Sequence, residues 1–250
     1  MNIIKDIIYV NKEAGAKTLK SFKKNWIIIF TGFIYTILNM LIYGILGSLL
    51  TGPLYIISGI IAALITSAMI SNYLYLLFNI INYDRVTIND FKNGFGYFLR
   101  KIYIVFFIGY VANLILSLVS NILGNLTAIL IPLLYLAVLV MLNPLPETIY
   151  LKHYDSWGSI VEAADFMKEN WLNWAIPNIV FLFLLYIVTG RSLINIFNTH
   201  LSYNFMLNVR GLGVYLIGQI IFSIMMIYRG HLYRLLSGST RRKRMFMNKF

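Results

Sequence analysis

Cysteine is absent from this 250-residue sequence, and Asp and Glu together number only nine. The lack of cysteine excludes disulfides, thiolate nucleophiles and cysteine-based metal sites. The few carboxylates are scattered, and no pair of them lies inside an apolar run, where acid–base chemistry within a membrane would require it.

Motifs of common catalytic sites are also missing. The three histidines, His153, His200 and His231, lie on separate segments and not at metal-ligand spacing. The sequence has no phosphate-binding lysine loop and no Gly-x-Ser-x-Gly elbow, and neither of its Gly-x-Gly pairs has the third glycine of a dinucleotide site. We therefore expect a non-enzymatic protein without a cofactor or a metal.

Apolar residues are abundant instead. They make up 59% of the chain, charged residues make up 12%, and the mean hydropathy is +0.75, values that place the protein in a bilayer. A helix needs roughly 20 mostly apolar residues to cross the hydrocarbon layer. Six runs qualify, so the expected fold is an all-α integral membrane domain over 1–250. The predicted spans are 26–47, 53–81, 102–123, 127–150, 172–189 and 211–228.

The positive charges predict the topology. The net charge is +12, and 19 of the 21 Lys and Arg fall in the N-terminal segment, in alternate connections and in a basic tail over 229–250. By the positive-inside rule, both termini are cytoplasmic in a cell membrane. The spans then form three hairpins, 26–81, 102–150 and 172–228.

Each hairpin follows a segment with apolar residues at helical spacing, in 1–25, 88–101 and 157–170. We expect three amphipathic helices lying in the plane of the cytoplasmic face. Two of them end in the signal Lys-x-Asn-Trp. Trp suits the headgroup level of a bilayer. The predicted interface anchors are Trp26, Trp171 and Trp174.

The segment MLNPLPETIY, 141–150, holds the most chemistry. Its prolines interrupt the fourth span, and its carboxylate lies near membrane depth, where ionisable groups are often functional. The candidate residues are Asn143, Pro144, Pro146 and Glu147. Glu147 could pair with a cytoplasmic Lys or Arg, or it could be a solvated charge at a helix end. We expect Glu147→Gln to preserve folding and to alter function more than a change at Glu162.

The tail clusters four cations next to Met and Phe residues. This pattern favours anionic lipid over RNA or a partner protein. The predicted lipid-binding residues are Arg241, Arg242, Lys243 and Arg244.

Three stretches, KTLKSFKKNW, the Pro-x-Pro-Glu end of the fourth span, and SIVEAADFMKENW, together resemble uncharacterised bacterial membrane proteins. That group is similar to the membrane domain of some glycerophosphodiester phosphodiesterases. The resemblance implies a six-span helical domain, and it implies no phosphodiesterase activity, because the hydrolase domain is absent. We expect a protein that engages the inner leaflet and assists transport, envelope maintenance or partner assembly.

The layout is also similar to six-span permeases of ABC-type exporters, with 88–101 and 157–170 as coupling helices. This second resemblance implies a transport subunit that works with a separate cytoplasmic ATPase.

Overall fold

The structure is a computed structural model and describes residues 3–49, 55–201 and 209–239. These residues form helices, turns and irregular segments, and no strand occurs among them. Six spans in this part of the chain are long and apolar enough to cross a membrane, as the sequence predicts. The helices are α1 (Ile3–Lys24), η1 (Trp26–Phe30), α2 (Thr31–Leu49), α3 (Tyr55–Tyr83), α4 (Ile88–Tyr97), α5 (Leu99–Leu123), η3 (Gly124–Leu126), α6 (Thr127–Met141), α7 (Leu145–Leu151), α8 (Ser156–Thr189) and α9 (Val209–Ser237).

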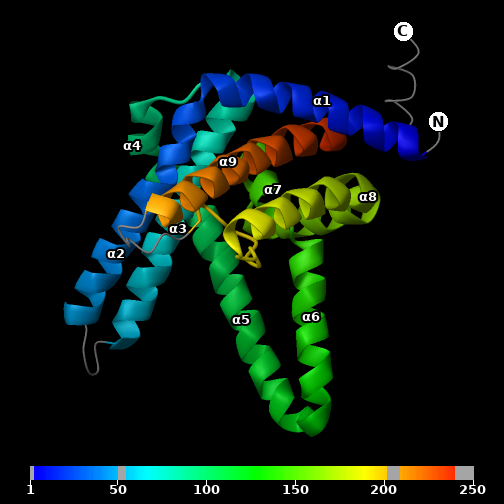
Figure 1. Cartoon of the computed structure of the whole chain (residues 1–250). Helices are drawn as coiled ribbons and strands as arrows, with labels where there is room; N and C mark the ends of the chain where they lie inside the picture. The colour runs from blue at the N-terminus through cyan, green and yellow to red at the C-terminus, as the bar shows by residue number, and fades with distance from the viewer. Residues whose placement is uncertain (1–2, 50–54, 202–208, 240–250) are drawn as a thin grey trace.

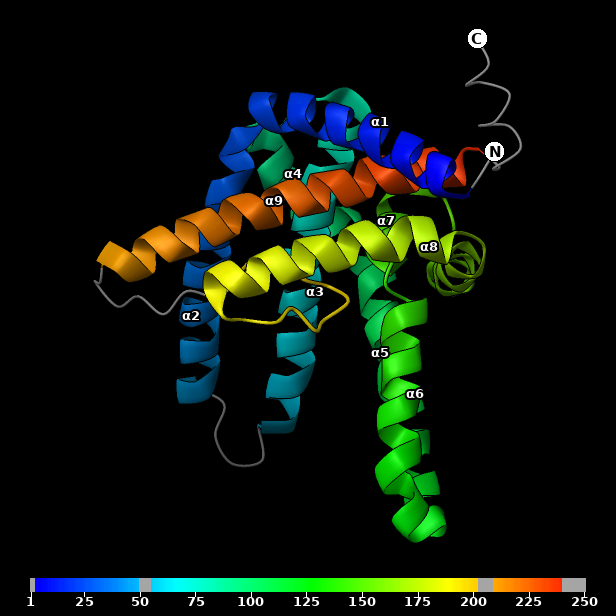
Figure 2. The same ribbon diagram turned by 45° about the vertical axis from the view of Figure 1, so that its right-hand side comes forward.

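The six long spans do not all run alike. Figures 1 and 2 show the α2–α3 and α5–α6 hairpins extending in one direction, while α1, α8 and α9 lie across them at the opposite end. The helices α1 and α8 both pack on α9. The third pair, α8 and α9, thus lies across the other two pairs. Besides α8, the helix α9 contacts α1, α3 and α7.

The N-terminal helix α1 ends at the first Lys-x-Asn-Trp signal. The side chain of Asn25 donates back to the carbonyl of Ser21, 2.9 Å away, and the chain continues as the 3₁₀ helix η1. Three β-branched residues, Ile27 to Ile29, follow Trp26, and β-branched side chains disfavour a continued α-helix. A bend therefore separates α1 from the first span.

The second segment, α4, is also a separate helix, and it is bound to the side of α3. Thr87 and Asp90 form a capping box at its start. The Ser71 hydroxyl donates to the Gly94 carbonyl at 2.7 Å and accepts from the Phe98 N–H at 2.8 Å. This close approach favours glycine at position 94, since a Cβ there would lie 3.0 to 3.2 Å from Asn72, closer than most Cβ contacts in proteins.

The third segment does not form a separate in-plane helix. Residues 157–170 and the fifth span are one continuous helix, α8, which passes through Trp171 without a break. Asn170 donates to the Phe166 carbonyl at 3.2 Å, as Asn25 does to Ser21, yet Leu172 to Ala175 continue the helix. The prediction that an in-plane helix ends at Trp171 is wrong, and α8 ends before Gly190, whose φ of 66° suits glycine.

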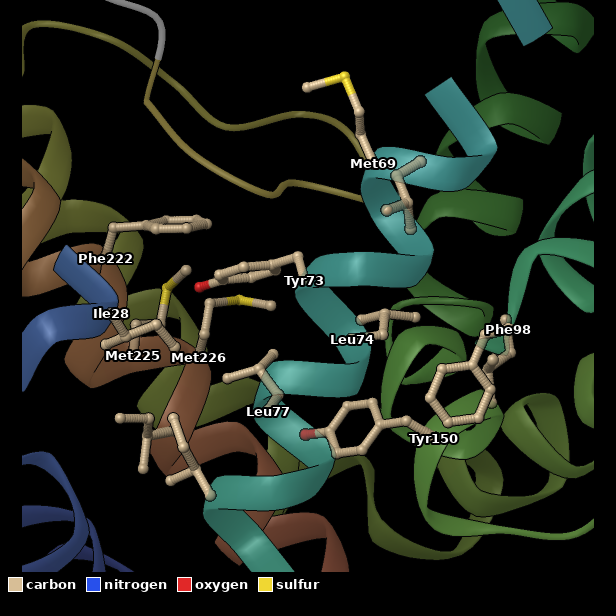
Figure 3. Packing of buried hydrophobic residues seen from close by; sticks show 14 of the residues in the cluster. Ile28, Met69, Tyr73, Leu74, Leu77, Phe98, Tyr150, Phe222, Met225 and Met226 are labelled. Carbon is tan, nitrogen blue, oxygen red and sulfur yellow. The ribbon is translucent and has the colours of Figure 1, made fainter. Parts of the chain in front are cut away.

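The apolar core lies where α3 meets α9. Figure 3 shows Tyr73 of α3 projecting toward Phe222, Met225 and Met226 of α9. The rings of Tyr73 and Phe222 stack with centroids 6.1 Å apart. Half of the most apolar stretch of α3 and of α9 is buried, against 11% in the α5 and α6–α7 spans. These two helices therefore form the centre of the molecule.

Candidate functional site

The Pro-x-Pro segment ends α6 and begins α7. Pro144 precedes α7 and Pro146 lies in its first turn, where a missing N–H costs no helical hydrogen bond. The carbonyls at the break find other donors, since Asn143 N–H bonds to Val140 at 3.3 Å and Leu145 N–H bonds to Leu142 at 3.0 Å. By contrast, Pro132 lies inside α6 without interrupting it.

Beyond the break, α7 points into the protein and carries Glu147 with it. Residues 145–150 are all buried, and Glu147 is 0% exposed. The carboxylate accepts two hydrogen bonds from Arg229 of α9, from Nε at 2.8 Å and from Nη2 at 2.9 Å. This bidentate geometry is the strongest form of an Arg–carboxylate pair.

Arg229 also donates to a backbone carbonyl at the break between α6 and α7. Its Nη2 donates to the backbone carbonyl of Asn143 at 2.7 Å. Its guanidinium carbon lies 5.2 Å from the ring centroid of Trp174, a cation–π distance. Trp174 in turn donates its indole N–H to Asn143 Oδ1 at 2.8 Å. We call these four residues, Asn143, Glu147, Trp174 and Arg229, the Arg229 network.

Close helix packing surrounds the Arg229 network. A Cβ at position 230 would lie 2.6 Å from the Tyr150 hydroxyl and 2.7 Å from Ile81, so only glycine lets α9 pass α7 and α3 here. Beside it, Thr148 donates to the Tyr233 hydroxyl at 2.9 Å. The buried hydroxyls of Tyr73 and Tyr150 have no hydrogen-bond partner within the described residues. The site is therefore enclosed by aromatic side chains from α3, α7 and α9.

The chemistry available to the Arg229 network is ion pairing. Its one carboxylate is fully buried and each of its oxygens accepts from a guanidinium, so it presents no surface to a substrate. Among the described residues, no group of three His, Asp or Glu side chains could hold a metal ion. The geometry therefore fits a structural role, in which the network holds α7, α8 and α9 together.

The four candidate residues of 143–147 do lie together. Of the two alternatives for Glu147, pairing with a Lys or Arg is the one observed, with Arg229, and the solvated helix-end charge is wrong, because no part of Glu147 reaches solvent. Asn143 contributes two acceptors: its side-chain Oδ1 accepts from Trp174, and its backbone carbonyl accepts from Arg229.

Two predicted placements need correction. Trp174 is 1% exposed and its N–H is bound inside the protein, so it has no surface to offer to headgroups, while Trp26 and Trp171 are 55% and 56% exposed. Arg229, expected at the start of a basic tail, is a buried residue of α9, which continues to Ser237. An arginine directly after the apolar run 211–228, in the same helix, was the signal for its role. The lipid-binding candidates Arg241 to Arg244 lie outside the described residues.

No family model, no curated protein and no solved structure matches this chain.

Proposed function

We propose that this chain is a non-enzymatic integral membrane protein that docks its N-terminal helix α1 on the anionic inner leaflet of the cell membrane. Such docking would suit a protein that assists transport, envelope maintenance or the assembly of partners. The proposal depends on one observation, namely which face of α1 is buried.

The buried face of α1 mixes polar and small apolar side chains, and α1 packs on α8 and α9. The buried residues recur at helical spacing and are Asp6, Val10, Ala14, Thr18 and Ser21, with Asn25 just after the helix. Asn173 of α8 donates to Asp6 at 3.1 Å, Tyr228 of α9 donates to Asn11, and Ser21 bonds to His231 at 3.1 Å.

The apolar face of α1 is therefore left outside. Ile4 and Ile8 are each 61% exposed, and Leu19 is 57% exposed. Large apolar side chains on the outside of a helix that also carries exposed lysines fit a helix lying at the boundary of headgroups and acyl chains.

Lysines border that apolar face. Lys5, Lys12 and Lys23 lie along one flank of it, since intervals of 7 and 11 residues return to the same side of a helix. All three are exposed, and none forms an ion pair among the described residues. Each lysine near an anionic surface contributes about 1 kcal/mol of attraction.

Spin labelling tests the docking, and the absence of native cysteine makes single-cysteine variants simple to prepare. A nitroxide at Ile8→Cys should be accessible to oxygen and protected from an aqueous nickel chelate in vesicles of phosphatidylglycerol. Protection should weaken in phosphatidylcholine vesicles and in the Lys5/Lys12/Lys23→Gln variant. A nitroxide at Ala16→Cys, exposed but off the apolar face, is the control. Equal nickel access at both sites in anionic vesicles would contradict the proposal.

The alternative is the permease subunit of an ABC-type transporter. The separate helix α4 supports it, because a coupling helix is expected between the second and third spans. The continuity of α8 speaks against it, because the second coupling helix would have to be separate from the fifth span. Recovery of a stoichiometric ATPase with the tagged protein would favour the permease, and purification with lipid alone would count against it.

A further inference from the structure

A second site lies away from both α1 and the Arg229 network. It is a cavity of about 370 Å³ between α2, α3 and the segment 192–200, a volume within the range of small-ligand sites. Its apolar lining is Met69, Ile70, Leu193, Ile194 and Phe197, and its polar lining is Asn39, Tyr43, Thr66, Ser192, Asn195, Asn198, Thr199 and His200.

This cavity has a polar lining although its residues lie deep within the first two spans. Asn39 lies near the middle of the first span, Trp26–Ser48, with Tyr43 one turn nearer its end, and Thr66 and Met69 lie near the middle of the second, Ile57–Tyr83. If this hairpin crosses the bilayer, the cavity lies at the depth of the hydrocarbon layer. Polar side chains at that depth face the protein interior or a water-filled space.

The third wall is irregular backbone. Residues 191–201 form no helix, and they are held against the helices by two anchors. The Leu201 N–H donates to Gln219 Oε1 of α9 at 3.1 Å, and the ring of Phe197 meets Phe106 of α5 edge-on, with centroids 5.6 Å apart. Non-helical backbone beside a transmembrane hairpin is tolerated only where it is buried in protein or lines a hydrated cavity.

One side chain, Asn39, indicates that water or a ligand occupies the cavity. Asn39 lies half-buried in the apolar helix α2 and makes no hydrogen bond to any described residue, although Tyr43 bonds to Thr66 at 3.1 Å one turn away. An amide without a partner at this depth is costly, so it needs water or a ligand.

The lining also defines the chemistry of that ligand. Among the residues that the structure describes, it contains no Asp, Glu, Lys or Arg. A charged ligand would therefore find no counter-ion, whereas amides and hydroxyls pair with groups that both donate and accept.

We infer that this cavity binds a neutral, hydroxyl-rich group, a sugar or polyol, within the membrane-spanning part of the protein. Its apolar residues would contact the C–H faces of such a group or the chain attached to it. Two sources share this chemistry: a free sugar and the headgroup of a neutral glycolipid. The inference does not depend on the docking of α1.

Binding measurements on the full-length protein test the inference. The protein is purified in an amine-oxide detergent, which carries no sugar, and is titrated calorimetrically with methyl glucoside. In a second arm it is placed in phosphatidylcholine nanodiscs with glucosyl diacylglycerol or with phosphatidylserine. Saturable binding of methyl glucoside would assign a free solute, and saturable binding of the glycolipid alone would assign a headgroup. Absence of saturable binding to both, or equal binding of phosphatidylserine, would overturn the inference.

Matched variants locate the binding. Asn39→Leu should weaken binding about tenfold, the effect of losing one buried hydrogen bond. Asn113→Leu is the control, since Asn113 bonds to Tyr135 in the exposed α5–α6 hairpin, outside the cavity. If Asn39→Leu does not fold, Tyr43→Phe against Tyr135→Phe gives the same comparison. Equal losses in the cavity variant and its control would refute the site.

Discussion

Arg229 connects three separate elements through one side chain. Its guanidinium serves the Glu147 carboxylate, the Asn143 carbonyl at the helix break and the Trp174 ring. A planar group with five donors can do this, whereas the point charge of a lysine cannot. Removal of one partner would leave the other charge buried and unpaired, which is the situation in which an ion pair matters most for stability.

We therefore predict that Glu147→Gln lowers the free energy of unfolding by about 3–5 kcal/mol, because Arg229 would keep its charge without a counter-ion. This replaces the expectation from sequence that the variant folds normally. Unfolding in mixed detergent micelles, followed by circular dichroism, measures the change. Glu162→Gln on the same protein is the control, since Glu162 is only half-buried on α8 and forms no ion pair among the described residues.

A double variant separates the charge from the packing. Glu147→Met combined with Arg229→Met should be more stable than either single variant, since an apolar pair of similar volume leaves no buried charge. If the two losses simply add, the ion pair would not be the reason for the instability, and the cost would lie in packing around α7.

Among the elements, the two Lys-x-Asn-Trp segments show what a local motif can and cannot specify. Asn25 and Asn170 make the same hydrogen bond to the carbonyl four residues earlier, yet α1 ends at the first motif and α8 continues through the second. The difference lies in the residues that follow and in the packing of α1 on α9. The prediction that a helix ends at the shared motif therefore holds for α1 and is wrong for α8.

The docking of α4 on α3 is testable with two glycines on the same helix. Gly96→Ala should stabilise the protein by about 0.5–1 kcal/mol, since a Cβ there meets nothing within 4 Å and alanine favours helix. Gly94→Ala should instead destabilise it by about 1–3 kcal/mol, because its Cβ presses on Asn72. Thermal unfolding and proteolysis of the segment 84–98 report both changes. Equal effects of the two substitutions would show that α4 is loosely attached.

The spans could be predicted from sequence because length and hydropathy decide membrane insertion. The assignment of residues to lipid or to protein could not, since the acyl chains are as apolar as a leucine core. Trp174 and Trp171 are three residues apart in one apolar run, yet one is buried and the other exposed. Glu147 was recognisable as a candidate, but its partner Arg229 is 82 residues away and becomes adjacent only through the packing of α7 on α9.

At the scale of the whole molecule, burial is uneven. The α5 and α6–α7 spans are 11% buried over their most apolar stretches, while α3 and α9 are 50% buried. Figures 1 and 2 show the α5–α6 hairpin extending from the rest of the protein. Its side chains Leu118, Ile122 and Ile129 are 66 to 83% exposed. An apolar surface of this extent is unfavourable in water, whereas a bilayer would cover it.

Six spans with nineteen cations on one side predict that both ends of the chain share the cytoplasmic face. Single cysteines in the cysteine-free chain test this with a membrane-impermeant maleimide on intact cells. Ile122→Cys, at the end of α5, should react without permeabilisation, whereas Ala16→Cys on α1 and Gly238→Cys after α9 should react only after it.

Asn195→Cys, on the segment between α8 and α9, is the decisive site, because α8 and α9 lie across the other spans. If they cross the bilayer, Asn195→Cys reacts from outside. If it reacts only after permeabilisation while Ile122→Cys reacts freely, the protein has four spans and α8 and α9 lie on the inner face.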